Sequence, residues 1–214
     1  MPNWTTTCVT LRHFSSKKIK ALKDEIRKDD PQILNHLRPQ PDNMFHGDVN
    51  DEIAKAYREK GRPNWYDWNL EFWGTKWDAK RVEINFSTMN TIELKFKTAY
   101  EPPIEWFDHI CSKGWKVDAI YQEETGYFVG VYKNGVNKKL INPVDAYINQ
   151  DAPQWLLDEW EYEFVSDLWD QDRINEKGDL LDDDGKIIKE FGTWGTDDVI
   201  TEYVGKQLAV REIL

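Results

Sequence analysis

Two segments of this chain alternate apolar and polar residues as paired β-strands do, and they flank one helix-like segment. RVEINFST (81–88) and TIELKFKTAY (91–100) are separated by two residues, which predicts a β-hairpin. WKVDAIYQEE (115–124) and GYFVGVYKNG (126–135) predict a second hairpin. Between them, EPPIEWFDHICSKG (101–114) has proline in its first turn and glycine past its end, which is typical of a helix. This order favours an α+β fold built on an antiparallel sheet.

The N-terminal residues add a strand and a helix to this order. TTTCVTLRHF (5–14) is rich in β-branched residues and predicts a strand, and Ile19, Leu22 and Ile26 then recur at helical spacing. VNKKLIN (136–142) predicts an edge strand after the second hairpin. The combined order predicts a ferredoxin-like antiparallel sheet with helices on one face.

We expect two parts in the chain, a ferredoxin-like α+β domain over residues 1–142 and an acidic helical extension over 143–214 that packs on it. Residues 30–50 contain three prolines and a glycine and predict a mostly looped, proline-rich insertion in the first part. Asp51 is expected to cap a short helix that runs to Lys60.

The C-terminal third has its own composition. Residues 143–214 hold 19 Asp and Glu against 6 Lys and Arg, a balance of −13, whereas residues 1–142 hold 20 acids and 22 bases, a balance of +2. An apolar stripe at helical spacing over 151–172, a hairpin over 178–192 and a closing helix over 197–214 are expected here.

This acidity bears on partners. A negative surface repels nucleic-acid phosphates and anionic lipid, so we expect neither direct nucleic-acid binding nor membrane binding. It suits a basic protein partner, with Asp182, Asp183 and Asp184 as the acidic partner surface, or it serves only solubility. A calcium-loop interpretation of DLLDDDG (179–185) fails, because Leu180 and Phe191 stand where such a loop needs carboxylates.

Aromatic residues make up 14% of the chain, with 11 Trp, and they are densest in NWYDWNLEFWGTKWDA (64–79). This stretch is interpreted as an irregular helical segment broken at Gly74, and three roles remain open for it: core, protein-interaction surface, or base or nucleotide pocket. The candidate residues for binding a ligand or partner are Trp73, Thr75, Lys76, Trp77, Asp78, Tyr127 and Tyr132.

The chain offers no catalytic or metal-binding pattern. The four histidines are far apart and no paired Cys spacing exists, so we expect no metal, no cofactor and no enzyme activity. Cys8 and Cys111 are interpreted as reduced thiols. No secretory signal and no apolar run long enough to span a bilayer is present, and we expect a cytoplasmic protein.

Three stretches stand out together: MPNW at the start, WYDWNLEFWGTKWDA (65–79) and TAYEPPIEWFDHI (98–110). With YQEETGYFVGVYKNG (121–135), which extends the match, they resemble the YubB ferredoxin-like family of phages, plasmids and other mobile elements. The resemblance covers residues 1–10 and 64–142. It departs at Thr5 and Thr7, where the family usually has Cys and Asn, and at Tyr100, where it usually has Trp.

The resemblance implies a ferredoxin-like fold and a mobile-element origin, and it implies no reaction or catalytic residue. We therefore expect an accessory protein in the host bacterial cytoplasm that binds, and inhibits or modulates, a host protein such as a defence protein. Two alternatives remain open: a nucleotide-signal binding protein, or sponge, that uses an aromatic pocket, and an acidic nucleic-acid mimic. The sequence does not indicate an oligomeric state.

Overall fold

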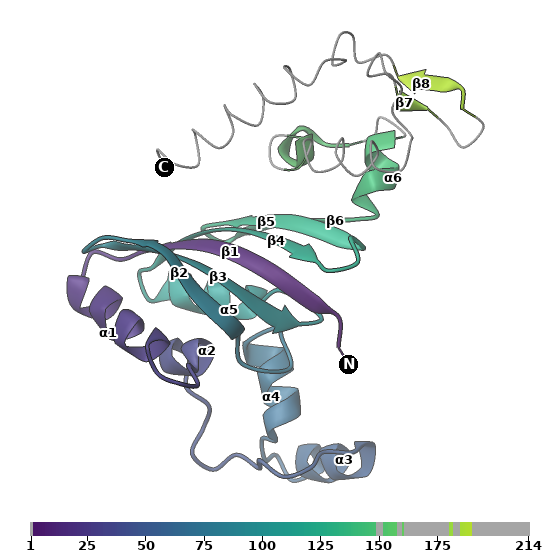
Figure 1. Cartoon of the computed structure of the whole chain (residues 1–214). Coiled ribbons are helices and arrows are strands. Elements are labelled where there is room, and N and C mark those ends of the chain that lie inside the picture. The colour runs from purple at the N-terminus through teal and green to yellow at the C-terminus, as the bar shows by residue number, and fades with distance from the viewer. Residues whose placement is uncertain (1, 149–151, 158–159, 161–179, 182–184, 190–214) are drawn as a thin grey trace. The chain divides into compact units, whose positions relative to one another are not determined.

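The computed structural model describes residues 2–148, 152–157, 160, 180–181 and 185–189. The chain divides into two compact units, residues 1–142 and 143–214, and each is described by itself. Figure 1 shows the elements of both units.

The first unit is built on a six-stranded antiparallel sheet with the strand order β2-β3-β1-β4-β5-β6. Its strands are β1 (Trp4–Arg12), β2 (Lys80–Ser87), β3 (Thr91–Ala99), β4 (Lys116–Glu123), β5 (Phe128–Lys133) and β6 (Val136–Ile141). Both predicted hairpins and the edge strand are present. The predicted α+β class and antiparallel sheet are confirmed.

Five helices belong to this unit: α1 (Ser16–Ile26), α2 (Ile33–Leu37), α3 (Asp51–Glu59), α4 (Trp65–Phe72) and α5 (Ile104–Ser112). The order β1-α1-β2-β3-α5-β4 with neighbours β2-β3-β1-β4 is the ferredoxin-like arrangement, to which β5 and β6 add two strands. Figure 1 shows α1, α2 and α5 on one side of the sheet, as the sequence predicts.

The core lies between these helices and the sheet. Along β1 the burial alternates, with Thr5, Thr7, Val9 and Leu11 buried toward the helices, which is the period of two that a half-covered strand imposes. The cluster continues through side chains from α1, α2, α5 and the neighbouring strands, among them Leu22, Ile33, Phe96, Trp106 and Val117.

The stretch 30–50 is mostly looped, as predicted, and it also contains the five-residue helix α2. The predicted cap of α3 needs correction. The cap of α3 is Asn50 rather than Asp51, because the Asn50 side chain accepts a hydrogen bond from the backbone N–H of Ile53 at 2.9 Å.

The second unit contains α6 (Pro143–Ile148) and a small antiparallel hairpin of β7 (Leu180–Leu181) and β8 (Ile187–Lys189). These two strands pair within the hairpin predicted over 178–192, and the rest of that prediction lies outside the described residues. Leu156 and Trp160 of the predicted apolar stripe are buried, and the remainder of the stripe lies mainly outside the described residues. The helix predicted over 197–214 also lies outside them, as do Asp182, Asp183 and Asp184.

Candidate functional site

The aromatic stretch folds as α4 followed by a sharp turn. Asn64 begins the helix by accepting the Asp67 N–H at 2.9 Å, and Trp73 ends it. Gly74 follows with φ of +80°, and a Cβ there would meet a carboxylate oxygen of Glu105 at 1.8 Å. The backbone conformation favours glycine here, and a side chain would also displace the Glu105 carboxylate.

Trp73 and Thr75 are parts of the interior. Trp73 is 2% exposed, and its indole N–H donates to the carbonyl of Arg38 at 3.0 Å. Thr75 is fully buried, and its hydroxyl donates to the carbonyl of Ala99 at 2.9 Å. Both polar groups are satisfied by backbone oxygens, so these two residues hold the turn against the sheet and present no face to a ligand.

Asp78 is a buried carboxylate that holds α2 in place. It accepts the backbone N–H groups of Leu34 at 2.9 Å, Asn35 at 2.8 Å and Ala79 at 2.8 Å. Desolvation raises the pKa of Asp78 to about 6, although the three N–H groups favour the charged form and act in the opposite direction. The side chain therefore links the proline-rich stretch to the end of the aromatic stretch.

Lys76 and Trp77 are half-buried and contact other aromatic residues. The Lys76 ammonium lies 4.6 Å from the centre of the Trp77 ring and 5.6 Å from that of Tyr66, which are cation–π distances. The Trp77 ring lies 6.3 Å from that of Trp4. These groups form an aromatic cluster (Trp4, Tyr66, Lys76 and Trp77) near the first residue of β1.

The two candidate tyrosines differ from each other in exposure. Tyr132 is 1% exposed, and its hydroxyl donates to Asp108 at 2.6 Å. Tyr127 is 54% exposed. Of the seven residues that the sequence singles out, Trp73, Thr75, Asp78 and Tyr132 are buried, so Trp73 and Tyr132 offer almost no surface to a ligand.

Segments distant in sequence meet beside the aromatic cluster. The N–H of Tyr100 donates to the carbonyl of Asn3 at 2.8 Å, and the N–H of Glu124 donates to the carbonyl of Trp4 at 2.9 Å. The buried Glu123 accepts the Thr125 N–H at 2.8 Å and the Tyr127 N–H at 3.2 Å. Desolvation would raise the pKa of Glu123, but these bonds and the Thr125 hydroxyl bring it below its ordinary value.

The opposite end of β1 carries a surface that the sequence analysis missed. Phe14 is 85% exposed and Met89 is 76% exposed, and the backbone bond from His13 N–H to the Asn90 carbonyl, at 3.0 Å, joins their two segments. We call Phe14 and Met89 the apolar tip. Its signal was present in the sequence: methionine is not one of the residues that favour a hairpin turn, and Met89 occupies one.

The buried His13 ring packs against Phe14 of the apolar tip. This ring stacks on Phe14 with centroids 4.5 Å apart and lies 4.9 Å from the Trp115 ring. Its Nδ1 accepts the Ser15 N–H at 2.9 Å, and burial, followed by the charge of Lys18, lowers the pKa of His13. The imidazole is therefore neutral near pH 7, and it fixes the position of an aromatic ring that is otherwise in solvent.

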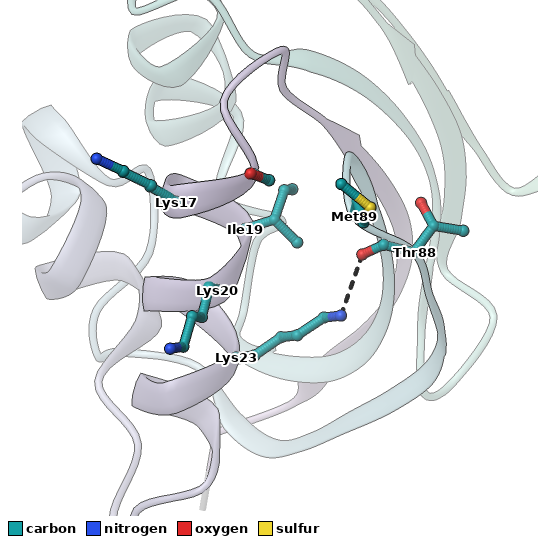
Figure 2. Close-up of a pocket in the computed structure, with 7 residues that line it drawn as sticks. Lys17, Ile19, Lys20, Lys23, Thr88 and Met89 are labelled. Atoms are coloured by element: carbon teal, nitrogen blue, oxygen red, sulfur yellow. Dashed lines mark hydrogen bonds between the residues drawn. The ribbon is translucent and has the colours of Figure 1, made fainter.

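A groove of about 540 Å³ adjoins the apolar tip between α1 and the β2–β3 turn. Figure 2 shows Ile19 facing Met89 across it, with Lys23 spanning the gap and the Lys17 and Lys20 side chains extending on the other side of α1. The Lys23 ammonium donates to the carbonyl of Thr88 at 3.1 Å. We call this the lysine groove, and it is lined by Ser16, Lys17, Ile19, Lys20, Lys23, Thr88 and Met89.

Two further observations concern chemistry and membranes. In the described ranges, no three His, Cys, Asp or Glu side chains come together where they could hold a metal ion. Within those ranges, too, every helix is too short or too polar to cross a bilayer.

Comparisons with known proteins identify one weak structural similarity. No family model matches the chain, and no curated protein matches it. Among solved structures, the chain is similar to the crystal structure of protein api92 from Yersinia pseudotuberculosis, described as DUF1281, with 9% identity and a TM-score of 0.39. The match covers 65% of this chain and 98% of that one. At this TM-score it supports neither a fold assignment nor a function.

Proposed function

We propose that this protein acts by binding a host protein, without chemistry of its own, and that the apolar tip is its principal contact. The observation that carries the proposal is the exposure of Phe14 and Met89, at 85% and 76%, on adjoining segments. In this proposal the chain is an accessory protein of a phage or another mobile element, as its resemblance to the YubB ferredoxin-like family suggests. It inhibits or modulates its partner, such as a defence protein, in the host cytoplasm.

The physical support comes from the association of exposed apolar side chains with interaction sites. Large apolar side chains gathered at one exposed place mark interaction sites more often than a single scattered one does. Aromatic residues and Met are enriched at the centres of protein interfaces, where one or two anchors supply most of the binding free energy. His13 stacks on the Phe14 ring, and such a contact reduces the side-chain freedom that binding would otherwise have to remove.

The other two functions considered from the sequence receive less support. The nucleotide pocket would use Trp73, Lys76 and Trp77 with Tyr127 or Tyr132. Of these residues, Trp73 and Tyr132 are only 2% and 1% exposed. Nucleic-acid mimicry by Asp182, Asp183 and Asp184 concerns residues outside the described part of the chain. Neither has an observation in its favour comparable to the apolar tip.

Capture from bacterial lysate, with the full chain as bait, tests the proposal. The double variant Phe14→Ser/Met89→Ser is compared with Tyr127→Ser/Val136→Ser, which removes two apolar side chains that are 54% and 58% exposed elsewhere. We expect a stoichiometric partner that the first variant loses and the second retains. Recovery of no stoichiometric partner, or equal recovery by both variants, would contradict the proposal.

A further inference from the structure

We infer that the host-protein surface that receives the apolar tip is acidic, with carboxylates placed around an apolar pocket for Phe14. This inference rests on the proposed function, because it names the chemistry of the partner that the apolar tip would contact. Two observations carry it: the concentration of positive charge around Phe14, and the position of two of these charges in α1.

Positive charge reaches Phe14 from α1. The His13 ring stacks on Phe14 with centroids 4.5 Å apart. Burial lowers the pKa of His13, and the nearby charge of Lys18 lowers it further, so the Lys18 ammonium lies close to this pair of rings. The imidazole is neutral near pH 7, and Lys18 forms no ion pair in the described part of the chain, so its charge is available to a partner.

Positive charge also reaches Phe14 from the connection between α5 and β4. A Cβ on Gly114 would lie 3.9 Å from the Phe14 ring, so this connection passes beside the ring. Lys113 directly precedes Gly114, and Lys116 begins β4 opposite Arg12 of β1. Both lysines are exposed, so the apolar tip has cations beside it on more than one element.

The charge around the apolar tip is opposite in sign to that of the whole chain. Residues 12–20 and 113–118 hold six Lys and Arg and one Asp, a balance of +5, and the β2–β3 turn adds no charged residue. The one acid, Asp118, pairs with Arg12. The net charge of the whole chain is −11. Positive charge is therefore concentrated where the apolar side chains are exposed, and an acidic surface complements it.

Two of these cations occupy positions that are unfavourable for α1 itself. The helix begins at Ser16, so Lys17 and Lys18 lie in its first turn, which holds no acid. The first turn of a helix favours anions, because its N–H groups carry partial positive charge, and cations there destabilise the helix. Proteins usually break such a local rule at functional sites. Carboxylates on a partner would compensate both the lysines and the helix end.

The same observations favour a protein over a nucleic acid or an anionic lipid surface. One face of the Phe14 ring is stacked on His13, and Met89 is not aromatic, so the apolar tip is a poor platform for successive bases. The net charge of −11 opposes the approach of a polyanion or an anionic membrane, whereas a protein pocket brings only a few carboxylates. A pocket that closes around Phe14 and Met89 also removes both apolar side chains from water.

Binding measurements on charge variants of the full chain test the inference. The host protein that the capture experiment recovers through the apolar tip is purified, and its binding to the full chain is followed by biolayer interferometry. The variant Lys18→Gln/Lys113→Gln/Lys116→Gln removes three charges beside Phe14, and Lys18→Glu/Lys113→Glu/Lys116→Glu reverses them.

The matched control is Lys95→Gln/Lys133→Gln/Lys138→Gln, at exposed lysines on β3, β5 and β6. Two further probes represent other anionic ligands. They are vesicles of phosphatidylcholine with phosphatidylglycerol, and a single-stranded DNA oligonucleotide.

We expect the glutamine variant to bind the captured protein at least about threefold more weakly than the wild type does, mainly through slower association, because charges at the rim of an interface steer the encounter. The glutamate variant should bind more weakly still, and the control variant should bind like the wild type. Raising the salt concentration from about 50 mM to about 500 mM should reduce the difference between the wild type and the glutamine variant. Thermal unfolding of each variant confirms that it is folded.

The inference fails, and the proposed function stands, if the wild type and both charge variants bind the captured protein equally or if the glutamate variant binds it more tightly. Lysine-dependent binding of the full chain to the vesicles or the oligonucleotide, stronger than its binding to the captured protein, would overturn the inference in favour of that ligand. Recovery of no protein through the apolar tip contradicts the proposed function, and the inference falls with it.

Discussion

Trp73 is 2% exposed and Phe14 is 85% exposed; Trp73 ends α4, and Phe14 lies two residues past the end of β1. Near the first residue of β1, the indole N–H of Trp73 is bonded to a backbone carbonyl. The rings of the aromatic stretch pack in the core or against other aromatic rings. Near the last residue of β1, a single phenylalanine and a methionine stand in solvent beside lysines that form no described ion pair. The densest group of aromatic residues therefore has mainly a structural role in our account. The exposed apolar residues, which are few, are the ones that we propose for binding.

Truncation of Trp73 should cause the largest loss in the free energy of unfolding, and it is the strongest test of the structural role of the aromatic stretch. Trp73→Ala opens a large space in the core and leaves the Arg38 carbonyl without its donor, so we expect a loss of about 3–5 kcal/mol in the free energy of unfolding. Urea denaturation measures it. Trp77→Ala, at a half-buried ring, should cost clearly less, and an equal cost would contradict the distinction between core and cluster.

Asp78 gives the next largest effect through pH. Its pKa in the folded state is about 6, above the ordinary value of 3.8, so the folded chain holds an extra proton between these values. The stability that this proton contributes is present below pH 3.8 and is lost as pH rises through about 6. Because one pKa unit corresponds to about 1.4 kcal/mol, the loss is about 3 kcal/mol.

The test for Asp78 is a comparison with Asp78→Asn, which does not titrate. The free energy of unfolding of the wild type relative to this variant should fall as pH rises from 4 to 7. A rise over the same range would show that the N–H groups of Leu34, Asn35 and Ala79 outweigh desolvation.

For Glu123, near the same end of β1, we predict the opposite pH dependence of the free energy of unfolding. Its carboxylate accepts bonds from Thr125 and Tyr127, and its pKa lies below the ordinary value of 4.5. Glu123→Gln should cost about 1–3 kcal/mol near pH 7, because it removes the negative charge that strengthens the bonds from Thr125 and Tyr127. This cost should shrink as pH falls below 4.5, and chemical denaturation at several pH values would show whether it persists instead.

The smallest effect on stability is expected at the apolar tip. Phe14→Ser and Met89→Ser remove side chains that are mostly in solvent, so each should change the free energy of unfolding by about 0.5 kcal/mol or less. Thermal unfolding measures the change. A loss near that of Trp73→Ala would mean that the apolar tip is part of the core, and the comparison between the two ends would fail.

Much of the fold could be predicted from local sequence patterns. Alternation identified the hairpins of β2–β3 and β4–β5, and the prolines and glycine around α5 identified that helix. Helix α2 was missed because Asp78, more than forty residues away, supplies the acceptor for its first N–H groups. Such a tertiary partner has no local signature in the sequence.

The candidate site was less predictable, because exposure is a property of the folded chain. Trp73 and Tyr132 looked like ligand contacts from their residue type, yet each has a buried partner for its polar atom, in Arg38 and Asp108. Phe14 is the last residue of the run 5–14 that predicts a strand, whereas β1 ends at Arg12, and nothing local in the sequence shows this earlier end. The spacing of Ile19, Leu22 and Ile26 predicted the buried face of α1 but gave no sign of the groove beside it.

Site-specific photo-cross-linking tests the central claim most directly. A photoreactive phenylalanine analogue is placed at position 14 in one version of the full chain and at position 127 in another, and both are expressed in host bacteria. Both positions are exposed in the folded chain, so the analogue reports only which one a partner covers. We predict a covalent adduct with a host protein at Phe14 and none at Tyr127; an adduct at Tyr127 with none at Phe14 would contradict the account.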